Sequence, residues 1–418
     1  MPSGKPKTVL VVSQVFIPDP ASVGQHMADV ALELARRGKL SGKYNVRVYA
    51  SARGFENPTT VYPRRQTIEN VDVRRIPFAS FGKKSILLRV LGTAVFMIQS
   101  FVAVIFTPRL AGIFFSTSPP LIGLPMAIAA AFLRVPVVYW AMDLNPDQLL
   151  ALGKIKPASL TARILETVNR FILRRSALVI ALDRFMADRL AARNIPRSKM
   201  LVMPPWPHDD KIHDDAATTE NPFRLRHNLA GKFVIMYSGN HSPSNPLTTL
   251  LDAVVQLRDD PTLQFLFVGG GNGKKEVEEY IRKYNLTNAT SLPYQPMADL
   301  KHSLSAADVH IVSLGEKMVG IIHPCKIYGA MAVGRPILFL GPRPSHISDL
   351  LDRHELGFQV SHGDTAGAVA AIQRFRTMPD EQLKSMGHTA ETVLNQSLNQ
   401  SLLCGQFCDR VVKALQIS

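Results

Sequence analysis

One short stretch of the chain gathers residue types that bind anions. Residues 314–337 read LGEKMVGIIHPCKIYGAMAVGRPI, and Lys326 and His323 stand there among mostly apolar residues. Lys326 opens a helix-like segment, and the first amides of a helix have no partner within it and favour negative charge. Gly320 lets the backbone of the preceding loop come close to a ligand. We therefore predict a phosphate site with Lys326 as its cation, although a lysine on a solvated helix face fits the same letters.

Glycines and an aspartate that follow apolar runs give a second signal. Gly239 ends the run FVIMYSG and Gly270 lies in FVGGGNGKK, so both fall where a buried strand turns into a loop. They allow close approach of a phosphate or nucleotide, and turn formation alone explains them nearly as well. Gly24 and Gln25 begin a helical pattern after a Pro-rich loop, where they could meet a ligand or only cap the helix. Asp143, after VPVVYWAM, could hold a ligand hydroxyl or cap the next helix.

Strand and helix patterns alternate along nearly the whole chain and would hold these residues. TVLVVSQVF is a continuous β-rich run of the kind buried in a parallel sheet, and apolar residues then repeat at helical spacing before the strand NVRVYA. The alternation continues to about residue 207 and resumes, after the polar segment 208–228, from KFVIMYSG. We predict an α/β fold of two Rossmann-like, doubly wound parallel-sheet domains that face a central cleft, over 1–207 and 208–380, followed by a helical tail at 381–418.

The composition limits the classes of partner. The 418 residues are 46% hydrophobic and include three cysteines, which suit a reducing cytoplasm and cannot build a disulfide framework. Cys404 and Cys408 have neither the second pair nor the histidine that a zinc site needs. The N-terminus lacks the apolar core of a signal peptide. A net charge of +15 favours anionic partners, and without a basic run or an RNA-binding aromatic motif we expect phosphorylated substrates or acidic lipid, not nucleic acid.

The segment 83–106 is the longest apolar stretch of the first domain. It reads KKSILLRVLGTAVFMIQSFVAVIF and has no charge between Val90 and Phe106, which is shorter than the about 20 residues of a spanning helix. Three interpretations remain: a spanning helix, a helix that lies on a bilayer with its other side buried, and a wholly buried helix. Flanking basic residues favour the second, because they suit an anionic membrane surface. These residues are Lys83, Lys84, Arg89 and Arg109.

Several of these segments, taken together, resemble a known enzyme family. They include FVIMYSGNHSPSNPLTTLLDAVVQL, FLFVGGGNGKKEVEEY, HPCKIYGAMAVGRPIL, PDPASVGQHMADVALELARRG and VPVVYWAMDLNPDQLLALG. From about residue 8 to 375 the chain resembles the retaining glycosyltransferases of family 4, of the type that builds exopolysaccharide, colanic acid and O-antigen. The resemblance implies the GT-B fold, with the acceptor bound mainly by the first domain, the nucleotide-sugar bound by the second, and no metal or other cofactor.

The resemblance also implies roles for single residues. PCKIY resembles the family's Pro-Ser-Lys followed by an aromatic, so Lys326 is implied to contact the donor diphosphate, with the amides of Gly320 to Ile322 behind it. Tyr294 in LPYQP is implied to border the base. From their places after strands, we also predict that Asp143 acts with Lys326 in catalysis and that Gly24 and Gln25 join Asp143 on the acceptor side, although family members often have a histidine near Asp143 that this chain lacks. The implied donor-binding set is Gly239, Asn240, Gly270, Tyr294, Glu316, Gly320, Ile321, Ile322, His323, Lys326 and Tyr328.

The chain departs from the family pattern at four positions. Asn240 and Asn245 stand where family members carry an arginine and a lysine. Ile321 and Gly329 occupy the places of two glutamates eight residues apart. Glu316 lies too early to replace the first glutamate without a shift, so it could bind a sugar hydroxyl or be a surface carboxylate.

We expect a cytoplasmic enzyme at the inner face of the cell membrane. It would move a hexosyl group from a nucleoside diphosphate-sugar to a lipid-linked or growing glycan with retention of configuration, in cell-surface polysaccharide biosynthesis. A sugar-nucleotide 2-epimerase of the same fold and a non-catalytic sugar-nucleotide or glycan-binding protein remain as alternatives. The missing arginine and lysine make the binding protein a credible alternative, and the fold does not decide among the three.

Overall fold

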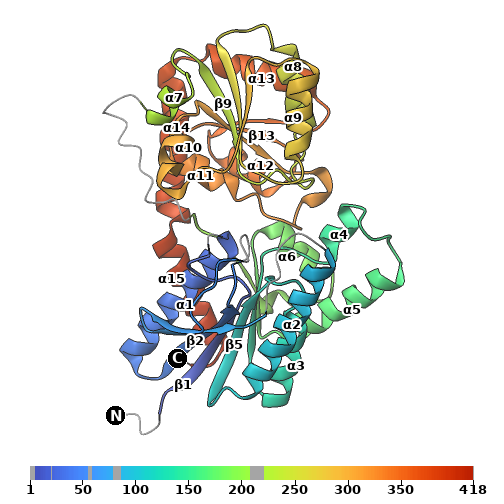
Figure 1. Ribbon diagram of the computed structural model, residues 1–418, viewed down its shortest axis with the longest axis vertical. Coiled ribbons are helices and arrows are strands. Elements are labelled where there is room, and N and C mark those ends of the chain that lie inside the picture. The colour runs from blue at the N-terminus through green and yellow to red at the C-terminus, as the bar shows by residue number, and fades with distance from the viewer. Residues whose placement is uncertain (1–4, 20, 55–58, 79–85, 208–220, 418) are drawn as a thin grey trace. The chain divides into compact units, whose positions relative to one another are not determined.

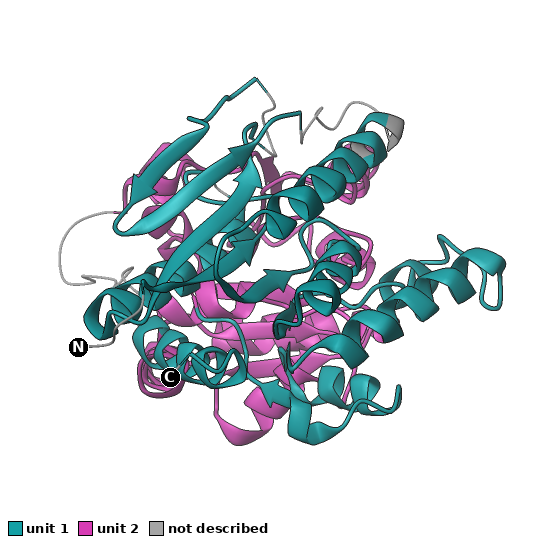
Figure 2. Ribbon diagram, turned by 90° about the horizontal axis from the view of Figure 1, so that it is seen from below, with its two compact units in different colours: residues 1–206, 400–418 teal, residues 207–399 magenta. Residues whose placement is uncertain are grey.

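The chain forms two compact units that do not follow its linear order. The computed structural model describes residues 5–19, 21–54, 59–78, 86–207 and 221–417. Unit 1 combines residues 1–206 with 400–418, and unit 2 consists of residues 207–399 (Figure 2). The tail predicted at 381–418 is therefore divided: α14 (Asp380–Val393) belongs to unit 2 and α15 (Gln400–Ala414) to unit 1.

Helix α15 belongs to unit 1 because it completes an aromatic core there. The ring centroid of Phe407 lies 4.5 Å from that of Trp140 and 5.7 Å from that of Phe114, and all three rings are buried. At the surface, Arg37 donates to the carbonyl of Gly405 at 2.9 Å. These contacts join residues far apart in sequence, so no local pattern in the tail announces them.

Unit 1 is built on an eight-stranded sheet in which one edge strand runs antiparallel to the others. In spatial order the strands are β3 (Arg65–Ile68), β4 (Val71–Ile76), β2 (Tyr44–Ser51), β1 (Lys7–Val12), β5 (Leu110–Ser116), β6 (Val137–Ala141), β7 (Leu178–Ala181) and β8 (Met200–Val202). The helices are α1 (Ser22–Ser41), α2 (Ile86–Ile105), α3 (Gly123–Leu133), α4 (Asp147–Ala151), α5 (Leu160–Arg175), α6 (Arg184–Ala191) and α15, with a 3-10 turn η1 (Arg197–Lys199). The strand order reverses between β1 and β5, as in doubly wound folds.

The hairpin of β3 and β4 was not predicted. Its two-residue turn is made by Glu69 and Asn70, whose φ angles are 52° and 126°. Such turns need positive φ at both positions, and asparagine tolerates that conformation better than most residues. The alternation in VDVRRI beside this turn was the available signal.

Unit 2 is built on a six-stranded sheet in which every strand is parallel to its neighbours. In spatial order the strands are β11 (Ala289–Leu292), β10 (Leu263–Val268), β9 (Phe233–Ser238), β12 (Val309–Ser313), β13 (Ile337–Leu340) and β14 (Gly357–Val360). The order reverses between β9 and β12, and ligands of such sheets bind outside the carboxyl ends of the strands at this switch point.

Helices cover the sheet of unit 2 (Figure 1). Helices α8 and α9 lie next to one another, and α10 and α11 lie apart from that pair. The elements are α7 (Pro222–Arg226), α8 (Thr248–Gln256), α9 (Lys274–Lys283), η2 (Met297–Asp299), α10 (Leu300–Ser305), η3 (Glu316–Met318), α11 (Lys326–Ala332), α12 (His346–Arg353), α13 (Thr365–Thr377), α14 and a π-helical turn η4 (Leu394–Leu398). The two sheets and most helices were predicted, because buried parallel strands are continuous apolar runs.

Helix α2 of unit 1 has one buried side and one exposed apolar side. Phe96 is fully buried, whereas Leu91, Ile98 and Val102 are 50%, 65% and 48% exposed. Their spacings of seven and four residues place these three side chains on one face. The interpretation of α2 as a wholly buried helix is therefore wrong.

No helix in the described part of the chain has both the length and the apolar character needed to cross a membrane. Lys83 and Lys84, predicted to flank α2 with positive charge, lie outside the described residues. So does most of the polar segment 208–228, since the structure resumes at residue 221.

Candidate active site

The structure brings Lys326 to the loop that follows β9. A Cβ on Gly239 would stand 2.8 Å from Lys326 Cε, and Gly239 has a φ of +125°, which side chains rarely adopt. The ammonium lies over the ring of Tyr237, with Nζ 5.1 Å from the ring centroid. Gly239 therefore makes room for the lysine stem at the switch point of unit 2, beyond simply turning the chain.

The ammonium of Lys326 is a desolvated charge. Within the described residues, Nζ makes neither a hydrogen bond nor an ion pair. Burial lowers the pKa of Lys326 to about 8, and the neighbouring Cys325 opposes this shift. The amine is still mostly protonated at pH 7. A shielded cation without a counter-charge is costly to the fold, and a bound anion would offset that cost.

Three glycines after β10 pack against the loop after β9. A Cβ on Gly269 would stand 2.0 Å from the carbonyl oxygen of Gly239, and one on Gly271 would stand 2.3 Å from Asn240 Oδ1. A Cβ on Gly270 would stand 2.9 Å from Cε2 of Tyr294, in the loop after β11. Asn240, Gly270 and Tyr294 of the predicted donor set thus lie in one cluster with Gly239.

Asn245 occupies a structural position at the switch point. Its side-chain amide donates to the carbonyl of Ser313 at 2.6 Å, which joins the loop after β9 to the end of β12. Family members carry a lysine here, and this chain uses the position to hold two loops together. A second lysine that could bind the same anion as Lys326 is therefore missing at this position.

The amides predicted to accompany Lys326 are largely occupied. The amides of Ile321 and Ile322 donate to the carbonyl of Met318 at 2.9 and 3.3 Å, and that of Tyr328 donates to Cys325 at 3.1 Å. Gly320 does make a left-handed turn, with a φ of +68°. The prediction that Ile321 and Ile322 offer free amides is wrong, because the 3-10 turn η3 supplies their acceptor.

His323 and Tyr328 form a buried pair that braces the loop before α11. His323 Nε2 lies 2.7 Å from the hydroxyl oxygen of Tyr328, and the ring of His323 packs 4.3 Å from that of His346 between centroids. Glu316, by contrast, is exposed at the start of η3. Among His323, Tyr328 and Glu316, only Glu316 has an exposed side chain.

His241 is a member of this cluster that the sequence analysis missed. Its backbone amide donates to the carbonyl of Gly270 at 2.7 Å and its carbonyl accepts from Gly273 at 3.0 Å. The imidazole is 1% exposed, and neither ring nitrogen makes a hydrogen bond within the described residues. Burial, with smaller contributions from Lys274 and Lys326, lowers the pKa of His241 to about 4. The available signal was a histidine directly after YSGN.

In unit 1, Asp143 lies just past the carboxyl end of β6. Burial raises the pKa of Asp143 to about 6, and its carboxylate has no hydrogen bond or ion pair within the described residues. It does not cap α4, which begins at Asp147 after Pro146. The carboxylate is thus available to a ligand hydroxyl.

Gly24 and Gln25 lie in the first turn of α1, which begins at Ser22, two residues earlier than predicted. Both amides donate to the carbonyl of Ala21, at 2.8 and 3.2 Å. A Cβ on Gly24 would stand 2.9 Å from Val15 Cγ1, so this glycine lets the helix pack against the loop after β1. Their contacts describe a packed helix start.

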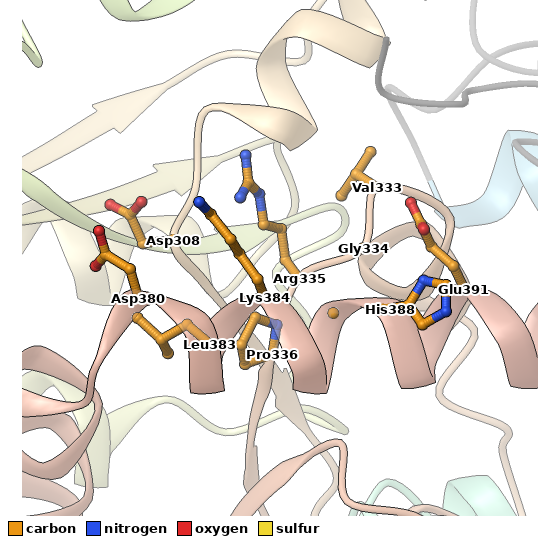
Figure 3. A pocket seen from close by; sticks show the side chains of 11 residues that line it. Asp308, Val333, Gly334, Arg335, Pro336, Asp380, Leu383, Lys384, His388 and Glu391 are labelled. Atoms are coloured by element: carbon orange, nitrogen blue, oxygen red, sulfur yellow. The ribbon is translucent and has the colours of Figure 1, made fainter. Parts of the chain in front are cut away.

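A cavity of about 420 Å³ lies at the opposite, amino edge of the unit 2 sheet (Figure 3). Arg335 and Pro336 before β13 and Asp308 before β12 line it together with residues of α14. Arg335 donates to the carbonyl of Ser305 at 2.9 Å. Charges of both signs surround this cavity, and none of the predicted site residues does.

The chain matches two family descriptions that together cover most of its length. Residues 23–206 match the Glycosyl transferase 4-like domain, and residues 232–377 match Glycosyl transferases group 1. The probable glycosyltransferase WbjE of Pseudomonas aeruginosa is 24% identical over 360 residues, 84% of this chain and 86% of WbjE. WcaI of Escherichia coli K12, assigned to colanic acid biosynthesis, is 24% identical over 348 residues, 78% of this chain and 81% of WcaI.

A solved structure shares the fold. Anabaena HepE, crystallised with UDP and glucose, superposes with a TM-score of 0.70 at 16% identity, over 97% of this chain and all of HepE. The two parallel-sheet units, the matching domains and this likeness agree with one another. The chain belongs to the glycosyltransferases of the GT-B fold, family 4 type.

Proposed function

We propose that this glycosyltransferase moves a hexosyl group from a nucleoside diphosphate-sugar to a lipid-linked or growing glycan, with retention of configuration. The observation that carries the proposal is the ammonium of Lys326, which is desolvated and without a counter-charge at the switch point of unit 2. The UDP and glucose bound by HepE support a nucleotide-sugar donor, and the colanic acid assignment of WcaI supports a role in cell-surface polysaccharide biosynthesis.

In the proposed mechanism, Lys326 acts on the leaving group. The bond between the sugar C1 and the diphosphate oxygen breaks while the acceptor oxygen bonds to C1 from the same face. Negative charge grows on the diphosphate, and a fixed cation stabilises that charge most in the transition state. The acceptor proton passes to a phosphate oxygen, and Asp143 accepts a hydrogen bond from a hydroxyl of the acceptor.

A thermal-shift screen with UDP, GDP, ADP, CDP and dTDP tests donor binding, since a ligand of the folded state raises its melting temperature. The matching nucleotide-sugars are then incubated with and without lipid-linked acceptors, and release of nucleoside diphosphate is measured. We expect turnover that requires an acceptor. Acceptor-independent formation of a 2-epimer would identify an epimerase, and binding without any turnover would identify a binding protein.

We also propose that transfer needs no metal, because Lys326 supplies the charge that a metal would otherwise bring to the diphosphate. Activity should therefore survive EDTA. Loss of activity on chelation with recovery on adding manganese would contradict this part of the mechanism.

We further propose that unit 1 docks on an anionic bilayer, at the inner face of the cell membrane, through α2 and α3. These helices pack side by side (Figure 1). The exposed apolar face of α2 continues onto α3, where Ile128 and Phe132 are 44% and 75% exposed. Phe106, just past α2, is 78% exposed. We call this set, with Leu91, Ile98 and Val102, the apolar face.

Basic residues at one end of the apolar face favour an anionic bilayer over a neutral surface. Arg109 and Arg134 are exposed; Arg134 directly follows α3, and Arg109 lies in the short connection between α2 and β5. The neighbouring parallel strands β5 and β6 begin just after them, so both arginines lie at the same edge of the sheet. Apolar groups beside arginines suit the boundary between acyl chains and anionic headgroups.

Vesicle co-sedimentation tests this docking. The protein should pellet with phosphatidylserine-containing vesicles, and less so as salt rises. The double variant Ile98→Glu with Phe132→Glu should stay in the supernatant, whereas Leu40→Glu, which alters an equally exposed leucine on α1, should pellet normally. A dimer that the double variant abolishes, with no vesicle binding by the wild type, would assign the face to a second copy instead.

A further inference from the structure

His241 is a buried, unbonded imidazole inside the cluster proposed to bind the donor, and its role rests on that proposed function. The residue lies in the loop after β9, and its backbone bonds to Gly270 and Gly273 of the glycine loop after β10. Its ring packs edge-on against Tyr237, with centroids 4.8 Å apart. Lys326 Nζ lies over the same tyrosine ring, so the imidazole and the ammonium are near neighbours of one side chain.

The groups around the imidazole come from three elements. Tyr237 belongs to β9, Lys274 to the start of α9, and Lys326 to the start of α11. The carbonyls of Gly239 and Gly270 also lie close enough to raise the pKa of His241, but they make no hydrogen bond with its ring. Lys274 donates to the carbonyl of Gly269 at 2.7 Å, so its charge is fixed in place.

Leaving both ring nitrogens without a hydrogen bond in a buried position is unfavourable, because the groups lose their bonds to water and gain none in the protein. Burial, helped by the charges of the two lysines, keeps the imidazole neutral at pH 7, with a pKa of about 4. A diphosphate beside Lys326 would reverse the local field. An opposite charge within reach shifts a pKa by about 1–3 units, and a diphosphate ester brings two such charges.

We propose that His241 is a proton-linked member of the donor site, which is neutral in the free protein and takes up a proton when the donor diphosphate binds beside Lys326. The proton comes from the solvent and returns to it when the nucleoside diphosphate leaves. The protonated imidazole then supplies an N–H donor and a second positive charge, at a site where this chain has Asn240 and Asn245 in place of the cations of its family.

Isothermal titration calorimetry in two buffers of different ionisation enthalpy measures this proton uptake directly. The probe is whichever of UDP, GDP, ADP, CDP and dTDP stabilises the protein most, at pH 6.5. The wild type should take up more protons than His241→Gln, by a fraction on the order of one-half. Affinity of His241→Gln should be about 10-fold lower than wild type at pH 6 and closer to it at pH 8. Titration of the ligand's own phosphate cancels in the difference.

The matched control is His388→Gln, which removes an exposed histidine that lines the cavity at the amino edge. It should take up as many protons as the wild type. Equal proton uptake by the wild type and His241→Gln would overturn the inference and leave donor binding intact. A wild type that binds none of the five nucleotides would instead overturn the proposed function, and the inference with it.

A measurement on the wild type alone covers the case in which His241→Gln does not fold. The chain has 12 histidines, and NMR of histidine-labelled protein follows the titration of each ring. On adding the nucleotide, one buried histidine should gain a much higher pKa. If no buried histidine changes its protonation while the nucleotide binds, the inference is wrong.

Discussion

Lys326 and Arg335 lie nine residues apart in unit 2, and their surroundings are opposite. Lys326 begins α11, against the glycine loops at the switch point, and its ammonium has no hydrogen bond or ion pair in the described part of the chain. Arg335 precedes β13 at the amino edge, where its guanidinium donates to the carbonyl of Ser305. The 420 Å³ cavity lies beside Arg335, whereas Lys326 is packed against Gly239.

The difference separates two uses of a shielded cation. A cation with a fixed acceptor holds parts of the fold together, while a cation kept without one is a cost to stability that a ligand would relieve. The cavity of about 420 Å³ at the amino edge of the sheet would by its volume be a candidate site. Charge and backbone contacts favour the carboxyl edge instead, where the reversal of strand order also predicts a ligand.

Replacing Lys326 by alanine should give the largest effect. Turnover should fall by about 100- to 1000-fold, the range for loss of one group that stabilises transition-state charge. The melting temperature should hold or rise, because a desolvated ammonium without a partner is removed. The control Lys384→Ala takes a lysine from the amino-edge cavity and should have near-normal turnover. If the two variants behaved alike, the contrast between the two edges would have no functional meaning.

Unit 1 also has a shielded charge without a fixed partner. The carboxylate of Asp143 makes neither a hydrogen bond nor an ion pair with any described residue. Its pKa of about 6 lies above the ordinary value, so the ionised form appears only as pH rises through 6. Turnover of the wild type should therefore decline from pH 7 to pH 5. Asp143→Asn should be slower by on the order of 100-fold at pH 7 and lose this decline. The raised pKa also means that ionisation of Asp143 lowers the stability of the folded protein, fully above pH 6 and not at all below the unfolded pKa.

A pH profile of Asp143→Asn that keeps the wild-type decline would assign the decline to another group. The melting temperature gives a second readout. The melting temperature of the variant should be higher than that of the wild type at pH 7, since a shielded carboxylate has been replaced by a neutral amide.

A methyl group at Gly239 should give a smaller effect by moving Lys326. Gly239→Ala would place a Cβ 2.8 Å from Lys326 Cε and force alanine into a φ of +125°. A displacement of this kind should weaken nucleoside diphosphate binding by about 10-fold. The control Gly231→Ala imposes a positive φ of +68° with no atom within 4 Å, so it reports backbone strain alone. Calorimetry that shows equal affinities for both variants would mean that the lysine does not depend on Gly239.

Arg335→Ala should leave turnover per folded molecule unchanged and lower stability only. Loss of its bond to the Ser305 carbonyl in a partly buried place should cost about 1–3 kcal/mol. Urea unfolding measures that change. A loss of turnover at full stability would show that the amino edge also takes part in the reaction.

The sequence predicted the sheets well because each buried strand is a self-contained apolar run, as in β9 and β13. It also placed Lys326 and Gly239 as candidates for one site, since loops after neighbouring parallel strands meet at one edge. Contacts between residues that are distant in sequence could not be predicted. The Met318 carbonyl that occupies the amides of Ile321 and Ile322 depends on a turn with no sequence marker.

His241 was missed for a related reason. The family pattern has cations at the positions of Asn240 and Asn245. His241, which lies between these positions, matches no part of that pattern. Only the three-dimensional packing of two glycine loops shows that this side chain is buried without a hydrogen bond.

The return of α15 to unit 1 has a consequence for the order in which the protein is made. During synthesis all of unit 2 leaves the ribosome before Phe407, the ring that closes the aromatic core around Trp140. Domains made earlier usually fold earlier. Here unit 1 is the first to begin synthesis and the last to be completed, because its aromatic core needs Phe407 of α15. A released chain truncated after residue 399 should thus hold a protease-resistant unit 2 and a unit 1 that proteases still cut.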